Sequence, residues 1–267
     1  MISKGENVRI GNNVSIGENV VIEDNVEIDS NTIIRNNVII KKNSFVGANC
    51  ILGEYQMDHY RKEEKNHPLE IGENAIVRSG SIIYGDCKIG DNFQTGHRVT
   101  IREHSKIGNH VSVGTLSDIQ GYCEIGNYVR MHSNVHIGQE SKIEDFVWLF
   151  PYVILTNDPT PPSYELKGVT LRSFSVIATA STLLPGVIVE GDSLVAAGAV
   201  VTKNVHKGEV VGGSPAKVIS SIDKIKNHIT GENVYPWRYT FKRGMPWEES
   251  DYLSWYEEVG KELGFEK

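Results

Sequence analysis

The chain has 267 residues, of which 39% are hydrophobic, and this is enough to build a substantial folded core. Its 27 Lys and Arg against 34 Asp and Glu give a formal charge of −7, which argues against a broad nucleic-acid-binding surface because such a surface needs clustered positive charge. It contains no apolar run of about 18 residues, and its first residues, MISKGENVRIG, lack a hydrophobic signal segment. We therefore expect a soluble, cytoplasmic protein without nucleic-acid or membrane partners.

A six-residue repeat begins at Ile10 and runs to Val201. Of its 27 complete hexads, 26 start with Ile, Leu, Val or Met, and Thr95 is the exception. The position four residues further on holds Ser, Thr, Ala, Val or Cys, except at Phe93. This pattern is typical of a short strand followed by a tight corner, with one large and one small side chain buried in each hexad.

Three hexads close one triangular coil, and successive coils stack about 4.8 Å apart with parallel strand pairing. The repeat therefore predicts a mainly-β fold, a parallel β-helix of about nine coils within residues 1–212. The period does not reveal the handedness of this helix. Cys50, Cys87 and Cys123 all take the small inward position, so we expect them to fill the core rather than form disulfides or a zinc site.

Two insertions interrupt the repeat. The step from Leu52 to Ile71 spans 19 residues instead of six, and the step from Leu155 to Leu171 spans 16, which predicts loops at about 53–70 and 156–170. Leu155 begins the fifteenth hexad after the hexad of Leu52. Because three hexads close one coil and fifteen is a multiple of three, both hexads lie on the same side of the prism. We therefore expect both loops on one side, about 24 Å apart, where they serve binding.

The last segment, residues 213–267, is expected to be helical. Apolar residues follow a helical stripe, which predicts a helix that stops near Gly231, and the stripe comprises Val218, Ile219, Ile222, Ile225 and Ile229. A second helix is expected at about 248–263. Its aromatic residues, Tyr252, Trp255 and Tyr256, are expected to pack against the β-helix or a neighbouring subunit.

The final coils are rich in small residues. Ala178, Ala180, Ala196 and Gly198 at corners would leave backbone polar groups accessible to a thin chain such as pantetheine, and Lys203 and Lys217 could hold phosphates. The segment GGSPAKVI (212–219), which contains Pro215, resembles the terminal G-[NS]-P-A-K segment of acyl-CoA-dependent hexapeptide transferases. This resemblance implies a left-handed β-helix and acetyl-CoA bound between neighbouring subunits of a homotrimer.

Three further segments narrow the resemblance. DNFQTGHRVTIRE (91–103), VRMHSNVHIG (129–138) and TNDPTPPS (156–163) resemble nucleotide-linked amino-sugar N-acyltransferases, closest to the dTDP-3-amino-3,6-dideoxyhexose N-acetyltransferases of surface-polysaccharide synthesis. The resemblance implies N-acetylation of a nucleotide-linked amino sugar, with acetyl-CoA as co-substrate and no metal. A UDP-linked acceptor, an amine at C4 and a different acyl group remain alternatives.

An amine that attacks a thioester must be unprotonated and held near the carbonyl carbon. A neutral imidazole suits this task, and we predict His132, at a corner, as the principal catalytic or amine-orienting residue. Asn157 and Asp158 resemble the family's loop residues that hold the sugar amine and its hydroxyls, although an Asx turn before proline is the alternative. His97, Arg98 and Glu140 are further candidates for nucleotide or sugar contacts.

The usual acetyltransferase pattern, with a histidine just ahead of the long loop, is absent. An acceptor that arrives as the free amine, with the coenzyme sulfur taking the proton, is therefore a second possible mechanism. Two other functions stay open. Gamma-class carbonic anhydrases use this fold with three histidines across a subunit boundary, and the spacing of His97, His132 and His136 permits such a zinc site. A non-catalytic scaffold is the third interpretation.

Overall fold

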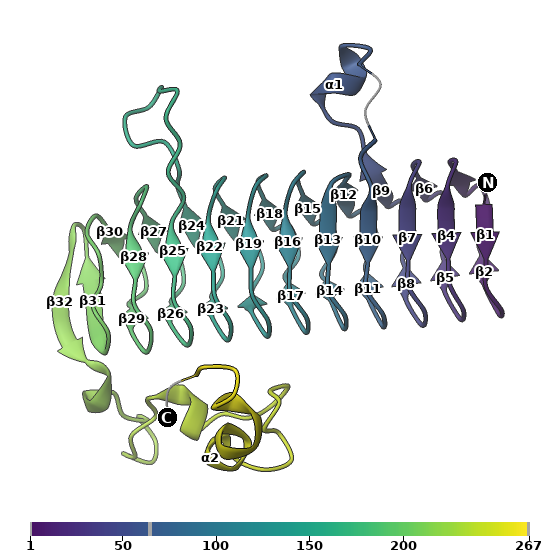
Figure 1. Ribbon diagram of the computed structural model, residues 1–267. Coiled ribbons are helices and arrows are strands. Elements are labelled where there is room, and N and C mark those ends of the chain that lie inside the picture. The colour runs from purple at the N-terminus through teal and green to yellow at the C-terminus, as the bar shows by residue number, and fades with distance from the viewer. Residues whose placement is uncertain (1, 64–65, 266–267) are drawn as a thin grey trace.

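The computed structural model describes residues 2–63 and 66–265 and shows a mainly-β solenoid, in which three stacks of strands form the sides of a long prism (Figure 1). Residues 64–65 of the first predicted loop lie outside the described part. Neighbouring strands along the prism pair in parallel, and paired residues are usually 18 positions apart, as at Lys88–Lys106 and Glu124–Lys142. The exceptions are the pairs across the two insertions and the last parallel pair, where Leu194 and Val210 are 16 positions apart. The final hairpin, residues 209–221, is antiparallel.

The first stack contains β1 (Ile2–Lys4), β4 (Val20–Ile22), β7 (Val38–Ile40), β10 (Leu69–Ile71), β13 (Cys87–Ile89), β16 (Lys106–Ile107), β19 (Glu124–Ile125), β22 (Lys142–Ile143), β25 (Thr170–Leu171) and β28 (Ile188–Val189). The second contains β2 (Arg9–Ile10), β5 (Glu27–Ile28), β8 (Phe45–Val46), β11 (Ile76–Val77), β14 (Gln94–Thr95), β17 (Ser112–Val113), β20 (Arg130–Met131), β23 (Trp148–Leu149), β26 (Val176–Ile177), β29 (Leu194–Val195), β31 (Glu209–Gly213) and β32 (Ala216–Ser221). The third contains β3 (Ser15–Ile16), β6 (Ile33–Ile34), β9 (Ile51–Glu54), β12 (Ile82–Tyr84), β15 (Thr100–Ile101), β18 (Asp118–Ile119), β21 (His136–Ile137), β24 (Ile154–Leu155), β27 (Thr182–Leu183) and β30 (Val200–Val201).

The prism is one coil longer than predicted. Within the described residues the first and third stacks have ten strands each and the second has twelve, so ten coils replace the expected nine. The additional coil begins at β1, where Lys4 pairs with Ile22. All three residues of β1 (Ile2–Lys4) are exposed. A search for buried aliphatic residues cannot find a strand that buries none.

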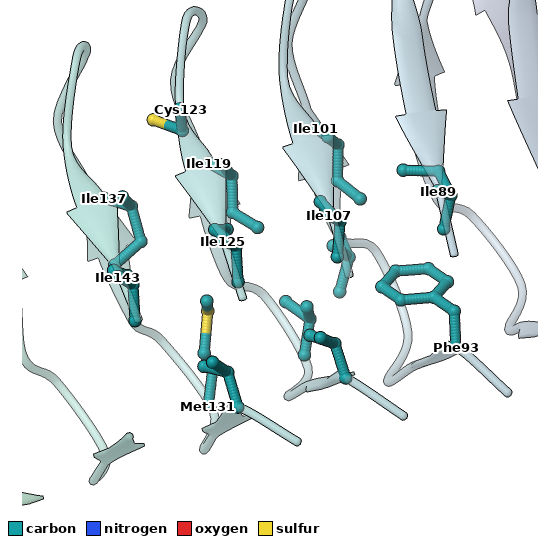
Figure 2. Packing of buried hydrophobic residues seen from close by; sticks show 14 of the residues in the cluster. Ile89, Phe93, Ile101, Ile107, Ile119, Cys123, Ile125, Met131, Ile137 and Ile143 are labelled. Carbon is teal, nitrogen blue, oxygen red and sulfur yellow. The ribbon is translucent and has the colours of Figure 1, made fainter. Parts of the chain in front are cut away.

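The core follows the predicted pattern of one large and one small side chain. Figure 2 shows stacked isoleucines from successive coils, with Phe93, Cys123 and Met131 among them. The three cysteines are free and buried, as predicted. Two hydroxyls in the small position bond to the backbone of the next coil: Thr32 donates to the Gly47 carbonyl at 2.9 Å, and Ser44 donates to the Gly72 carbonyl at 3.1 Å. Polar core residues therefore leave no unmet hydrogen bond at these two sites.

Both insertions leave the same side of the prism, as predicted. They follow β9 and β24, which both belong to the third stack, and Figure 1 shows the two loops projecting in the same direction. The first loop contains the short helix α1 (Met57–Tyr60). We call the corners that follow the third-stack strands the loop edge.

The C-terminal segment departs from its predicted helices. Residues 216–221 form β32, antiparallel to β31, and a 3-10 turn, η1 (Ile222–Lys224), follows. The helical spacing of Val218 and Ile219 is overridden because β31 offers unpaired backbone groups at the open end of the prism. Both side chains are exposed.

The rest of the C-terminal segment packs against the prism on the side away from the loops (Figure 1). It contains η2 (Trp237–Tyr239), α2 (Tyr252–Trp255) and a π-helical turn, η3 (Tyr256–Gly260), in place of the longer helix predicted. Tyr252 lies edge-on to Phe174 at 5.7 Å, and Trp255 lies edge-on to Phe146 at 5.7 Å. The β-helix itself is thus what these aromatic residues contact. No helix among the described residues has the length and apolar character needed to cross a membrane.

Candidate functional site

Most of the predicted site residues lie along one edge of the prism. This edge consists of the corners that follow the second-stack strands, and we call it the histidine edge. In order along the prism, its predicted residues are His97, Arg98, His132, Ala178, Ala180, Ala196, Gly198, Pro215 and Lys217. They come from segments up to 120 positions apart in the sequence, and only the coiling of the chain puts them in one line.

A hollow of about 550 Å³ lies at the end of this row nearer the N-terminus. His97 and Arg98 line it together with the hydroxyls of Ser79 and Thr115, and the described residues around it include no Asp or Glu. The backbone N–H of His97 donates to Thr115 Oγ1 at 3.1 Å, which fixes the corner. A cationic, hydroxyl-lined hollow has the chemistry to bind an anion such as a phosphate.

His132 lies in the middle of the row, directly after β20. Its backbone N–H donates to the Leu149 carbonyl at 2.8 Å, and its ring stacks on Phe150 with centroids 4.7 Å apart. Gly114 makes room for this corner, because a Cβ at residue 114 would clash with the His132 carbonyl carbon at 2.3 Å. Partial burial of the imidazole against the aromatic rings lowers the pKa of His132, so the neutral form is favoured at pH 7. A neutral imidazole can accept a proton or a hydrogen bond.

Small residues occupy the other end of the row. Ala178 follows Phe150 by one coil and Ala196 follows Ala178 by another, with backbone hydrogen bonds linking the three corners. Ala180 and Gly198 take the left-handed position of these corners and are exposed, and a Cβ on Gly198 would meet no atom within 4 Å. The edge is therefore narrow and uncovered at this end, which fits the slender chain of an acyl-CoA.

Four predicted residues lie elsewhere. Glu140, Asn157, Asp158 and Lys203 follow third-stack strands and belong to the loop edge. A hexad separates neighbouring edges and spans at most about 20 Å when extended. A single chain thus places Asn157 and Asp158 across one face of the prism from His132.

Asp158 makes its hydrogen bonds within the second loop. Its carboxylate accepts from the backbone N–H of Ser163 at 2.9 Å and of Thr160 at 3.1 Å, and from Ser163 Oγ at 2.6 Å. The hydrogen bond from the Ser163 hydroxyl is the main reason that the pKa of Asp158 is lowered. This is the turn geometry that the sequence left open as an alternative, and it shapes the loop around the proline run.

One polar pair on the third face, Asp118 with His136, was not predicted as a pair from the sequence. Asp118 and His136 lie one coil apart on β18 and β21, and His136 Nδ1 is 3.2 Å from Asp118 Oδ2. Gln120 Nε2 donates to the same carboxylate. Partial burial opposes ionisation of Asp118, but the hydrogen bonds from His136 and Gln120 outweigh it and lower its pKa. The 18-residue spacing of the two residues was the signal that could have revealed them.

A histidine also fastens the first loop. His67 Nε2 lies 2.5 Å from Asp58 Oδ2 of α1, and His67 Nδ1 lies 2.5 Å from Asp86 Oδ2 of the prism. Burial opposes the charged imidazole, but the hydrogen bonds to both carboxylates outweigh this and raise the pKa of His67. The His67 ring thus bridges the loop to the loop edge, and its contacts with two carboxylates favour the protonated form.

The three histidines of the carbonic-anhydrase alternative do not converge within one chain. His97 and His132 are two coils apart on the histidine edge, and His136 pairs with Asp118 on the adjoining face. No group of three His, Cys, Asp or Glu among residues 2–63 and 66–265 has the geometry to hold a metal ion.

Comparison with known proteins locates the repeat. A family model described as "Bacterial transferase hexapeptide (six repeats)" matches residues 19–54. The chain is 39% identical over 74 residues to gamma carbonic anhydrase 1, mitochondrial, of Arabidopsis thaliana, which covers 27% of each protein. It is 33% identical over 95 residues to a 2,3,4,5-tetrahydropyridine-2,6-dicarboxylate N-acetyltransferase of Staphylococcus aureus, covering 36% of this chain and 34% of that one.

These matches are partial, since the chain spans only 27% and 34% of the length of the two curated relatives. Among solved structures, an Arabidopsis UDP-N-acetylglucosamine acyltransferase aligns over 82% of this chain and 72% of its own, at 18% identity and a TM-score of 0.45. A likeness at that level carries no functional argument. Residues 19–54, which form the second and third coils of the prism, are therefore hexapeptide repeats of the type described for bacterial transferases.

Proposed function

We propose that the protein is an acetyl-CoA-dependent N-acetyltransferase that acylates a nucleotide-linked amino-deoxy sugar. The preferred acceptor is a dTDP-3-amino-3,6-dideoxyhexose destined for surface polysaccharide. One observation carries the proposal: a cationic hollow, a neutral imidazole and an uncovered run of small residues follow one another along the histidine edge. The partial match to an N-acetyltransferase supports acyl transfer to nitrogen.

The donor lies along the small-residue end of the edge. Ala178 is two coils from His132, or about 10 Å, so a pantetheine chain that follows the corners brings its thioester toward the imidazole. Ala180 and Gly198 leave the corners low enough for this chain. Pro215 and Lys217, at the β31–β32 turn, are near the far end, where Lys217 can meet a phosphate.

The acceptor binds from the other direction. The hollow at His97 and Arg98 lies two coils from His132, about 10 Å away, which is a suitable separation between a sugar amine and the phosphates of its nucleotide. Arg98 gives a bidentate donor for phosphate oxygens. Donor and acceptor would then meet at His132 from opposite ends of one edge.

The reaction needs one proton acceptor. The amine nitrogen attacks the thioester carbonyl carbon, the carbon–sulfur bond breaks, and the products are an amide and free CoA thiol. His132 takes the proton that the amine loses, because its lowered pKa keeps the ring neutral at pH 7. The proton then passes to the coenzyme sulfur, so acid and base balance over the cycle.

A convex edge cannot enclose its ligands alone, and a second copy of the chain supplies the missing wall. The loop edge of a neighbour brings Asn157, Asp158, Glu140 and Lys203 opposite the histidine edge, and three copies of a three-sided prism build three such clefts as a homotrimer. Asn157 then contacts the sugar, while Asp158 holds the loop that carries it.

The test is thiol release from acetyl-CoA against dTDP-linked and UDP-linked 3-amino and 4-amino sugars, with and without a zinc chelator. We expect turnover with the dTDP-linked 3-amino sugar, unaffected by the chelator. Coenzyme binding with no turnover on any amino sugar would reject the acceptor class. Absence of coenzyme binding would overturn the acyltransferase proposal, and loss of thiol release in the chelator would overturn its metal-free mechanism.

A further inference from the structure

Large side chains take the left-handed backbone position at several corners of the prism. This region suits Gly and Asn but disfavours bulky residues, because their Cβ crowds the backbone. Asparagines fill it in the first coils, as at Asn31 on the histidine edge and Asn37 on the loop edge, with φ of 61° and 62°. Among residues 2–63 and 66–265, six Leu, Phe or Tyr residues take it instead: Leu116, Tyr122, Tyr128, Phe146, Tyr152 and Phe174.

The C-terminal segment covers three of these six residues. Tyr128, Phe146 and Phe174 follow first-stack strands, and we call the corners after those strands the covered edge. Phe146 packs against Trp247 with ring centroids 5.2 Å apart, and Phe174 packs against Trp237 at 5.9 Å. Both phenylalanines are buried. On this edge, packing against another part of the chain offsets the unfavourable backbone position.

The other three residues lack such a cover within the chain. Leu116 and Tyr152 on the histidine edge are 52% and 59% exposed, and Tyr122 on the loop edge is 54% exposed. Asn134 holds the equivalent corner between Leu116 and Tyr152, so the repeat itself does not require a bulky residue there. An exposed apolar side chain is ordinary alone, but at a left-handed corner it carries a backbone cost. These three residues therefore indicate contact with another chain.

Leu116 and Tyr122 lie at nearly the same height along the prism. They are one hexad apart, and a hexad rises by a third of the coil spacing, about 1.6 Å. In a ring of copies whose axis is parallel to the prism, every coil keeps its height from one copy to the next. When the histidine edge of one copy meets the loop edge of another, Leu116 is thus level with Tyr122 of that copy. Tyr152 is level in the same way with Asp158, at the start of the second loop.

The same two residues border two hollows. Leu116 lines the hollow of about 550 Å³ that also contains Arg98, and Tyr122 lines a second hollow of about 680 Å³ beside the first loop. Arg61 of the first loop lines the second hollow and is exposed. Corners of the same three coils contribute to both hollows. Contact between Leu116 and Tyr122 of two copies would therefore merge the hollows into one cleft.

Three acidic groups of the second hollow have basic partners within the chain. Asp58 and Asp86 both contact the ring of His67, and Glu103 pairs with Arg102 at 2.6 Å. These contacts leave the second hollow close to charge balance rather than strongly acidic. A phosphate group that enters the merged cleft can thus be approached by arginines from both of its walls.

We propose that Leu116 of one copy packs against Tyr122 of a second copy, and that the first loop of this second copy forms the outer wall of the acceptor hollow. Arg61 then approaches, from across the cleft, the diphosphate that Arg98 binds. The contact between copies follows from the corner residues, whereas the ligand in the cleft rests on the proposed function. The first loop thus acts in acceptor binding and leaves the donor path untouched.

The contact between copies is tested with the double variant Leu116→Cys/Tyr122→Cys and a short bismaleimide crosslinker. The native cysteines are buried, so the two added thiols react preferentially. We expect covalent dimers and trimers on a denaturing gel, and none from either single variant. Leu116→Cys/Phe45→Cys is the matched control, because Phe45 is exposed on a second-stack strand three coils from Leu116. Uncrosslinked chains from the double variant, or equal crosslinking in the control, would overturn the proposal.

The shared cleft is tested by calorimetric titration with dTDP and UDP, without acetyl-CoA. Arg61→Gln should weaken binding roughly fivefold through loss of one charge-assisted hydrogen bond. Arg9→Gln, at an exposed arginine of the first coil, should bind as the wild type does. In coexpressed Arg98→Gln and Arg61→Gln chains, about a quarter of the sites should regain both arginines if neighbouring copies share the cleft.

The two parts of the proposal fail separately. Wild-type affinity in Arg61→Gln, or no recovery in the coexpressed chains, would remove the first loop from the acceptor site. Crosslinked assemblies that bind neither dTDP nor UDP would keep the contact between Leu116 and Tyr122 but reject the nucleotide-linked acceptor of the proposed function.

Discussion

The histidine edge and the loop edge are built from the same hexads but use their corners differently. Both hold non-glycine residues in the left-handed backbone region, with φ of 55° at Arg98 and 60° at Ala180 on one, and 58° at His104 and 63° at Glu140 on the other. The backbone frame is thus equivalent, and the contrast between the two edges comes from their side chains.

On the loop edge, polar side chains engage one another. His67 bridges Asp58 and Asp86, and Asp158 accepts three hydrogen bonds within its loop. On the histidine edge, the corners carry the exposed His97–Arg98 pair, the imidazole of His132 and several small residues. Within one chain, the loop edge therefore uses polar side chains to hold the two insertions, whereas the corners of the histidine edge are available to ligands.

Replacement of His132, on the histidine edge, should have the largest effect on kcat. His132→Phe keeps a ring against Phe150 but removes the nitrogen, and we expect kcat to fall roughly 100-fold as general-base catalysis is lost. His136→Phe on the adjoining face is the matched control and should retain most activity. A smaller loss in His132→Phe than in His136→Phe, with the assembly intact, would transfer the role to the Asp118–His136 pair.

The pH profile sharpens the same prediction. Because the pKa of His132 is lowered, the ring is already neutral at pH 7, and kcat/KM should fall only when the pH drops below the usual histidine range of about 6.5. This acid limb should vanish in His132→Phe. If it persists there, the titrating group is another residue or the substrate amine.

A bulkier corner should block the donor path. Ala180→Leu places a larger side chain at this corner. The equivalent corner position is Asn134 two coils earlier and Leu116 three coils earlier, and Leu116 has a φ of 61°. The backbone therefore accepts leucine, and we expect the KM for acetyl-CoA to rise roughly tenfold through steric overlap. The KM for the sugar should stay near its wild-type value, and an unchanged KM for acetyl-CoA would remove this corner from the donor path.

Two substitutions in the second loop test whether Asp158 only shapes the loop or also contacts the substrate. Asp158→Asn and Ser163→Ala each weaken the same hydrogen bond, so a purely loop-shaping Asp158 predicts a similar increase in sugar KM, roughly fivefold. Steady-state kinetics on both variants decides this. A much greater loss in Asp158→Asn alone would mean that the carboxylate touches the substrate.

The smallest effect concerns the first loop. The pKa of His67 is raised in the folded protein, so its stabilising contribution is complete below about pH 6.5 and is lost as pH rises through the folded value. Hydrogen-exchange protection of residues 55–63 should therefore decrease between about pH 6 and pH 9. In His67→Gln, protection should be low at both pH values, and a variant with the wild-type pH dependence would assign the fastening to another group.

Much of the architecture could be predicted from the sequence because the repeat is local. Each hexad carries its own strand and corner, so the buried positions and the common side of the two loops follow from counting. Lys4 shows the limit, since an exposed strand leaves no hydrophobic mark. The C-terminal segment at Val218 shows a second limit, because the helical spacing of its apolar residues could not reveal that β31 would need a strand partner.

The candidate site divides in the same way. The chain shows which residue types are available, including His132 and the small corner residues, because these stand out against a regular pattern. Which of them share an edge depends on the folded coils, since corners become neighbours after 18 residues rather than six. The pairing of Asp118 with His136 likewise depends on side chains from different coils meeting in space.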